Sequence, residues 1–281
     1  MGRGLYDSFS ICANDYWMQH PQEMVHTISH EHFHTWNGIK MPPADPKSEL
    51  FWFTEGFTEY YTHKLNQSAG VITQEEYVEK MNAIIHKYFT SPAKKYSNSQ
   101  VAKEFKADNK VWDIDYFRGA LLAACWDREI QLRMQGIFSL DNVMLLLRHK
   151  TNGKEVTKKA IIECAALFLQ ERAGYEVQHY LMEGNEIILP QDLFGPAYIL
   201  KWVKAGAVVV SSIYQSDSSQ FIPQFVKKPL DRSFAESCCQ FLRTLDFSNS
   251  LTFCMLAAFP KIVVFEKLIS NLRQSNCPEA P

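Results

Sequence analysis

Apolar residues in the first two thirds of the chain recur at intervals that favour helices. Between residues 113 and 135, for example, Leu121, Leu122, Cys125 and Ile130 are interspersed with polar residues over a span too long for a single strand. Helices are expected in six segments: 21–37, 48–65, 73–89, 113–135, 139–150 and 156–171. Residues 91–109 are polar and are expected to form a loop. The pattern predicts a mainly α fold.

The predicted helix ends carry residues that commonly start and stop helices. Pro21 suits the first turn of a helix, and Gly38 follows the last residue of the first segment. Thr73 and Glu76 form an N-terminal capping pattern, and Ser139 begins a second one. These residues set the boundaries given above.

Strand signals are few, and most lie near the two ends of the chain. Leu5 to Ile11 is compatible with a short strand. In the C-terminal part, residues 207–210 indicate a strand, and residues 250–258 indicate a short helix or strand without clear periodicity. We therefore expect two regions: a helical domain at 1–195 and a C-terminal region of uncertain fold at 196–281.

The composition is that of an ordinary globular protein. Of 281 residues, 46% are hydrophobic and 21% are charged, and the net charge is −2. This charge balance argues against nucleic acid as a partner, and no apolar run approaches the roughly 18 residues of a membrane span. The seven cysteines have irregular spacing, which favours a reducing compartment. We expect a cytoplasmic protein; its oligomeric state does not follow from the sequence.

The most specific chemistry lies in the segment from Ser29 to Leu65. His30, Glu31 and His34 form an H-E-x-x-H pattern. Residues four apart lie on one face of a helix, so His30 and His34 can present a ring nitrogen each to one ion. Glu31 lies about 100° round the helix, within reach of a water molecule beside that ion. The pattern is typical of zinc hydrolases, although it also occurs by chance.

A catalytic zinc needs a third protein ligand, which must come from another segment. Glu55 is the natural candidate, because a short loop folds the helix at 48–65 back against the first helix. Glu59 lies one turn further on the same face. It could orient a ligand histidine, or it could be a solvated charge.

Two more histidines flank the pattern. His26 lies one turn before His30, so ligand sets that include His26 are conceivable. An ordinary partner on the helix face is the preferred interpretation for His26. His32 points to another side of the helix, and we expect it to be structural or to face solvent.

Several segments together resemble a known family. They are His30–Asn37, Trp52–Tyr61, Tyr116–Leu121, Ser139–Met144, and Tyr180–Gly184 with Leu189–Pro190. In this order they are similar to motifs of the glycyl aminopeptidase family of gluzincin metallopeptidases. These enzymes are related to leukotriene A4 hydrolase and aminopeptidase N.

This resemblance implies a thermolysin-like zincin catalytic domain that removes small N-terminal residues, such as Gly or Ala, from peptide substrates. It implies that His30, His34 and Glu55 bind Zn²⁺. Glu31 matches the general base that accepts the water proton, and Tyr116 matches the tyrosine that stabilises the tetrahedral intermediate.

Three features depart from the family. Its members carry a β-rich domain before the catalytic helices, for which this chain shows no counterpart. A family glutamate thought to bind the substrate's amino terminus corresponds to Tyr6 here, with Asp7 as the neighbouring acid. Residues 196–281 lack the loop motif of the PDZ domain found in many relatives. Two alternatives therefore stay open: a truncated, non-catalytic zinc-binding remnant or interaction module, and a zinc hydrolase of a non-peptide substrate.

Overall fold

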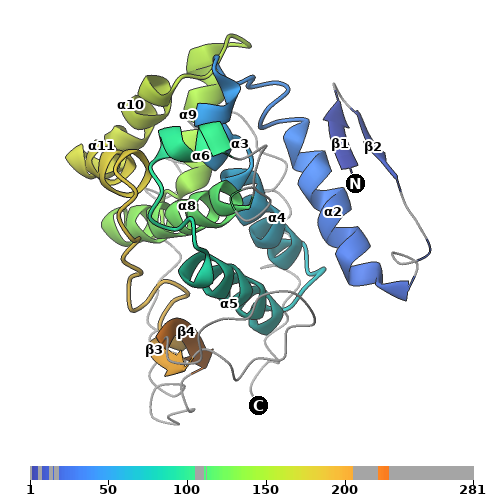
Figure 1. The fold of residues 1–281 in the computed structure, drawn as a ribbon, viewed down its shortest axis with the longest axis vertical. Coiled ribbons are helices and arrows are strands. Elements are labelled where there is room, and N and C mark those ends of the chain that lie inside the picture. Colours follow the sequence, from blue (N-terminus) through green and yellow to red (C-terminus); the bar gives the residue numbers. More distant parts are fainter. Residues whose placement is uncertain are drawn as a thin grey trace, which may run out of the picture. The chain divides into compact units, whose positions relative to one another are not determined.

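The computed structural model describes residues 2–5, 8–12, 15, 19–104, 111, 113–204 and 221–227. They belong to one compact unit, residues 1–228, in which helices predominate (Figure 1). The helices are α2 (Pro21–His34), α3 (Phe51–Thr54), α4 (Gly56–Ser68), α5 (Gln74–Thr90), α6 (Asn98–Glu104), α8 (Ile114–Arg133), α9 (Leu140–Thr151), α10 (Lys158–Leu169) and α11 (Glu171–Glu176). The remaining elements are the 3-10 helix η1 (Lys47–Leu50), the π-helix η2 (Val177–Met182) and the strands β1 (Gly2–Leu5), β2 (Ser8–Ile11), β3 (Tyr198–Lys204) and β4 (Phe221–Lys227).

The long helix α8 forms the centre of the unit. It packs against α3, α4 and α5, and also against α9 and α10. Helix α2 lies between α4 and the antiparallel hairpin β1–β2 (Figure 1). The fully buried rings of Trp52, Phe57 and Trp126 meet edge to face, with centroids 5.8 and 5.9 Å apart. The mainly helical class predicted from the sequence is confirmed.

Helix α8 touches the junction of α3 and α4 backbone to backbone. A Cβ atom on Gly119 would lie 1.9 Å from the carbonyl oxygen of Trp52. A Cβ atom on Gly56 would lie 2.4 Å from the Cα atom of Gly119. Only glycine at both positions permits this approach, which brings the N-terminal turn of α8 close to Glu55.

The predicted helix starts are confirmed where capping residues mark them. Thr73 and Glu76 make the reciprocal bonds of a capping box at α5, and Ser139 begins a capping box at α9. Pro21 occupies the first turn of α2. Gly38, expected as the helix stop, has a φ of +120° and lies shortly beyond the end of α2.

The segment 48–65, expected as one helix, begins with the 3-10 turn η1 and continues as α3 and α4 up to Ser68. Glu55 separates α3 from α4 but keeps helical dihedral angles. Its N–H donates to Phe51 O at 2.8 Å, and its carbonyl accepts from Glu59 N at 2.8 Å. The helical path therefore continues through the residue expected to bind the metal.

The prediction of a loop at 91–109 is wrong in part, because α6 lies within it. Ser97 N–H donates to the side chain of Gln100 at 2.8 Å, and the Gln100 N–H returns a bond to Ser97 at 3.3 Å. This is a capping box, a signal that the polar composition hides. Asn98 is buried and bonds to Glu49 O and to Arg118, which ties α6 to η1 and α8.

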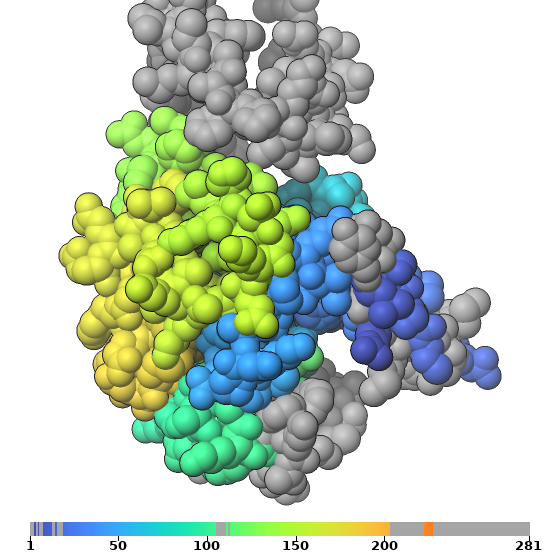
Figure 2. All heavy atoms as spheres, turned by 90° about the horizontal axis from the view of Figure 1, so that it is seen from above, coloured from blue at the N-terminus to red at the C-terminus, as the bar shows by residue number. Residues whose placement is uncertain are grey.

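The loop that follows α2 is held by a distant segment. Ala44 N–H donates to Val156 O at 2.8 Å, and Val156 N–H donates to Pro42 O at 2.7 Å. Figure 2 shows the corresponding contact, where the yellow-green segment after α9 lies against the blue segment that leads into α3. None of the helices in the described part of the chain has the length and apolarity needed to cross a membrane.

The hairpin β3–β4 lies beyond the proposed boundary at residue 195 and was not foreseen. Tyr198 pairs with Lys227 in its antiparallel register. The side chain of Asn82 on α5 bonds to both backbone groups of Phe225, at 2.8 Å each. The division into 1–195 and 196–281 stays a prediction. The expected elements at 207–210 and 250–258 lie outside the described residues.

Candidate metal centre

Three side chains from α2 and the α3–α4 junction converge on one point. The Nε2 atoms of His30 and His34 lie 3.1 Å apart. Oε2 of Glu55 lies 3.4 Å from the first nitrogen and 3.1 Å from the second. The four-residue spacing on α2 and the packing of α2 on α4 thus bring together the three ligands expected from the sequence.

The chemistry and spacing of these atoms fit a metal ion. Two imidazoles and one carboxylate are a common donor set for zinc. Donor atoms at about 2.0–2.1 Å from a tetrahedral zinc lie about 3.3 Å from one another. The observed separations of 3.1 to 3.4 Å are close to that value. His30, His34 and Glu55 could therefore hold an ion with little rearrangement.

The Nδ1 atoms of His30 and His34, which face away from the convergence point, also have hydrogen-bond partners. His34 Nδ1 lies 3.0 Å from Asn37 O, and His30 Nδ1 lies 3.1 Å from Glu59 Oε2. We assign the hydrogen to Nδ1 in each ring, because the carbonyl and the carboxylate can only accept. When both rings are neutral, as metal binding requires, each Nε2 presents a lone pair towards the convergence point. Such outer contacts fix the orientation of metal ligands.

Asn37 supports His34 from a buried position. Its Nδ2 atom donates to Phe53 O at 3.0 Å and to Thr54 O at 3.3 Å, and it lies 3.2 Å from the hydroxyl of Thr58. The residue therefore fastens the end of α2 to α3 and α4 while its own carbonyl orients His34. The sequence analysis gave Asn37 no role of its own, although it ends the first segment that resembles the family.

The charges of the site favour a cation. In the metal-free protein, burial opposes a charge on His30, but hydrogen bonds with Glu55 and Glu59 outweigh burial and raise its pKa to about 9. Burial would by itself raise the pKa of Glu55, yet hydrogen bonds with His30 and His34 keep it well below the usual range. Burial also opposes ionisation of Glu59, but hydrogen bonds with three histidines keep its pKa well below the usual range, so both carboxylates are ionised at neutral pH.

A cleft of about 340 Å³ opens in front of the three ligands. Glu31 and Tyr116 line it together with His30. The ring of Tyr116 stacks on that of His30, with centroids 5.8 Å apart and planes at 19°. Burial, followed by the charge of Glu55, raises the pKa of the Tyr116 hydroxyl far above its usual range. The hydroxyl therefore stays protonated and can donate a hydrogen bond.

The other predicted residues have varied outcomes. His26 lies on the same face as His30 and contacts Glu59, as expected of a partner on the helix face. His32 is exposed, and the ring of Phe9 meets its edge at a centroid distance of 5.9 Å. Tyr6 and Asp7, considered for binding the substrate's amino terminus, lie outside the described residues.

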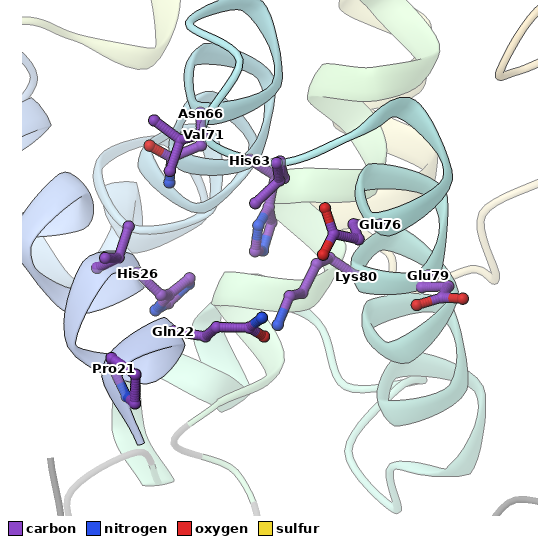
Figure 3. A pocket seen from close by; sticks show the side chains of 11 residues that line it. Pro21, Gln22, His26, His63, Asn66, Val71, Glu76, Glu79 and Lys80 are labelled. Atoms are coloured by element: carbon purple, nitrogen blue, oxygen red, sulfur yellow. The ribbon is translucent and has the colours of Figure 1, made fainter. Parts of the chain in front are cut away.

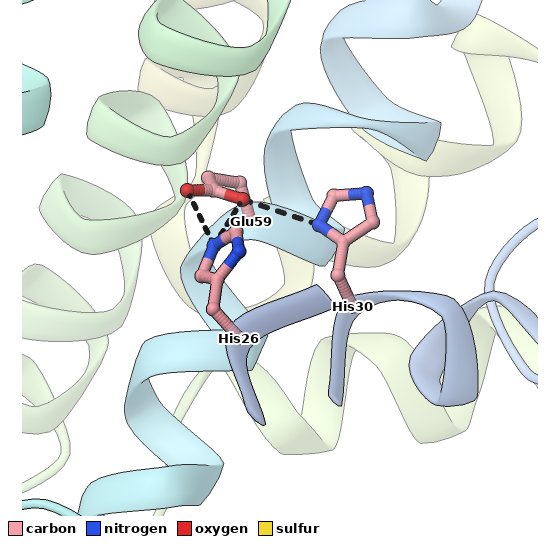
Figure 4. Close-up of side chains that lie close together, drawn as sticks. All are labelled: His26, His30 and Glu59. Carbon is pink, nitrogen blue, oxygen red and sulfur yellow. Dashed lines mark hydrogen bonds and ion pairs between the residues drawn. The ribbon is translucent and has the colours of Figure 1, made fainter. Parts of the chain in front are cut away.

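A second group of potential ligands comprises His26, His30 and Glu59 (Figure 4). It would use Nδ1 of His30, the nitrogen opposite to the one that faces Glu55. Each oxygen of Glu59 already lies 3.1 Å from two imidazole nitrogens. Oε1 contacts His26 and His63, and Oε2 contacts His26 and His30. Three imidazole nitrogens therefore make four contacts with the two oxygens of Glu59, which leaves little room for an ion at this carboxylate. The group with Glu55 is the better metal site.

Comparison with known proteins agrees with the geometry. A model of the M61 glycyl aminopeptidase family matches residues 23–121. This segment includes the expected ligands His30, His34 and Glu55 and the cleft residues Glu31 and Tyr116. No curated protein matches the chain.

One similar solved structure is an aminopeptidase N family protein from Idiomarina loihiensis. It is 17% identical in sequence, with a TM-score of 0.59. The match covers 77% of this chain and 42% of the other, so the chain corresponds to less than half of that protein. At this identity the match shows a shared fold. The family match covers residues 23–121, less than half of the chain, and over that segment the chain is similar to glycyl aminopeptidases.

Proposed function

We propose that this protein hydrolyses peptides with a zinc ion held by His30, His34 and Glu55. The observation that carries the proposal is the convergence of two Nε2 atoms and one carboxylate oxygen, at 3.1 to 3.4 Å from one another, at the base of an open cleft. The outer nitrogens of both histidines are held, so the donors are oriented before metal binds.

Each cleft residue has a role in this proposal. Zinc, when bound, lowers the pKa of a water molecule and polarises a substrate carbonyl. Glu31 accepts the proton of the attacking water and later delivers it to the leaving amine. The protonated hydroxyl of Tyr116 donates a hydrogen bond to the oxygen that becomes negative as water attacks.

Aminopeptidase action on small N-terminal residues is the finer part of the proposal, and the family match supports it. The described residues that line the cleft include two cations, Arg3 and Lys47. Its lining carboxylates, Glu31 and Glu55, already have roles in catalysis and metal binding. The group that would pair with the substrate's ammonium is therefore not among the described lining residues.

The test combines zinc content with turnover in the purified full chain. We expect about one zinc per chain and hydrolysis of glycyl or alanyl peptides, with much slower hydrolysis when the amino terminus is blocked. Glu31→Gln should keep the zinc and lose the turnover by a factor of at least about 100. Equal turnover of free and blocked peptides would refute the exopeptidase part alone. Bound zinc without any peptide hydrolysis would favour the non-catalytic zinc-binding module.

A further inference from the structure

Glu59 lies at the centre of a cluster of three imidazoles. Its side chain is 13% exposed. His30 approaches one oxygen through Nδ1 at 3.1 Å, and His63 approaches the other through Nε2 at 3.1 Å. His26 Nε2 lies 3.1 Å from both oxygens (Figure 4). One carboxylate thus connects an expected metal ligand to two histidines that have no place in the catalytic scheme.

The two additional histidines come from different helices. His26 is one turn before His30 on α2, whereas His63 is one turn after Glu59 on α4. Their rings lie side by side, with centroids 5.1 Å apart. Both line a second pocket of about 240 Å³, whose other walls include residues of α5 (Figure 3). The cluster is therefore formed only when α2 and α4 pack together.

We propose that His26 and His63 are positioning residues that hold Glu59 in the orientation it needs to fix His30 for metal binding. The proposal rests on the metal site of the proposed function. It adds an outer layer to that site, which reaches from the metal ligand through Glu59 to the second pocket.

The physical reason is that a carboxylate bonded to one imidazole alone can still rotate. His63 fixes the oxygen that does not face His30, and His26 bridges the two oxygens. With both in place, the second oxygen is held within 3.1 Å of Nδ1 of His30. The bond keeps the hydrogen on Nδ1 and the lone pair on Nε2, which is the tautomer that a metal requires.

The two histidines should not contribute equally. The side chain of His63 is 6% exposed, and that of His26 is 35% exposed. Water can more readily replace a donor lost at the more exposed His26, whereas a donor lost at His63 leaves its oxygen with only the contact of His26, which is shared with the other oxygen. Removal of the His63 donor should therefore weaken zinc binding more than removal of the His26 donor.

The experiment measures the zinc affinity of the full chain by competition with a chelator. Glu59→Gln should weaken zinc binding by about 10- to 100-fold. His63→Leu should weaken it by about three- to tenfold, and His26→Leu by less. His63→Gln, which keeps an N–H donor near the position of Nε2, should restore most of the affinity. His32→Leu serves as the matched control, because it removes an exposed imidazole from the same helix α2 without touching the cluster.

Two features of the result separate positioning from general stability. In a Glu59→Gln background, His63→Leu should cause no further loss of zinc affinity, because its effect passes through the carboxylate. A His63→Leu protein with a lower Tm but unchanged zinc affinity would overturn the proposal, as would equal losses for His63→Leu and His63→Gln. A wild-type chain that binds no zinc would overturn the proposed function along with this inference. Normal zinc binding in every variant would overturn this inference alone.

Discussion

The close packing of α8 on the α3–α4 junction makes a sharp prediction for Gly119→Ala. The added methyl group would lie 1.9 Å from Trp52 O, whereas carbon–oxygen contacts are normally about 3.3 Å or longer. Helices α8 and α3 would have to move apart by about 1.4 Å to relieve this contact. Overpacking of this kind costs roughly 3 kcal/mol, and the better helix propensity of Ala returns about 1 kcal/mol. We expect a net loss of about 2 kcal/mol, which for a domain of this size lowers the Tm by about 4–8 °C.

The same substitution should impair the cleft. Tyr116 lies one turn before Gly119 on α8, so a shift of the helix moves its hydroxyl relative to Glu55 and His30. A displacement of about 1 Å can cost about 100-fold in turnover. Zinc content should be retained, because the expected ligands lie on α2 and at the α3–α4 junction and none of them lies on α8.

Gly174→Ala is the control for this prediction. A Cβ atom on Gly174, in α11, would lie 3.6 Å from a methyl carbon of Ile162, which is an ordinary contact. We expect a stability change within about 1 kcal/mol, in the stabilising direction. Thermal unfolding and peptide turnover should be measured on both variants. If Gly119→Ala kept the wild-type Tm and turnover, the backbone contact would not be what positions Tyr116.

Three further predictions concern the metal centre. Tyr116→Phe should lower kcat by about 10- to 1000-fold with unchanged zinc content, because it removes only the hydroxyl donor; unchanged kcat would exclude the role of that hydroxyl. Glu55→Ala should yield protein with little zinc after dialysis, and full zinc retention would place the third ligand elsewhere. The pKa of His30 is raised from 6.5 to about 9 in the metal-free protein, and zinc must displace that proton. Apparent zinc affinity, measured by titration, should therefore rise by up to about tenfold per pH unit until about pH 9. A fall in affinity with rising pH would contradict this. Protonated His30 also stabilises the metal-free protein; this stabilisation is complete below pH 6.5 and is lost as the pH rises through about 9.

The proximity of His30 and His34 follows from the sequence because the geometry is local. His30 and His34 share a face in any regular helix, so their proximity does not depend on the rest of the fold. Glu55 required the additional inference that a second helix folds back beside the first. The structure confirms that arrangement, and the Glu55 carboxylate lies next to both rings.

The outer contacts of the site could not be derived in the same way. The bond between His63 and Glu59 is local to α4, but its link to His26 and His30 depends on how α2 rotates and slides on α4. The pattern of apolar residues does not determine these two quantities. The close approach of Gly119 likewise becomes visible only once α8 has been placed.

Short elements were the least predictable part of the fold. Helix α6 was missed although Ser97 and Gln100 carry a capping signal, because its surroundings are polar. The hairpin β3–β4 was missed because its strands are stabilised by distant contacts, such as those of Asn82 with Phe225. Where strands depend on non-local pairing, a local pattern carries little information.

The most direct test of the metal centre is a crystal structure of the zinc-loaded protein with anomalous data collected at the zinc edge. A single peak is expected about 2.0–2.1 Å from Nε2 of His30, Nε2 of His34 and a carboxylate oxygen of Glu55. Glu59 should remain bonded to Nδ1 of His30. A peak between His26, Glu59 and Nδ1 of His30, or no peak near either group, would contradict the assignment.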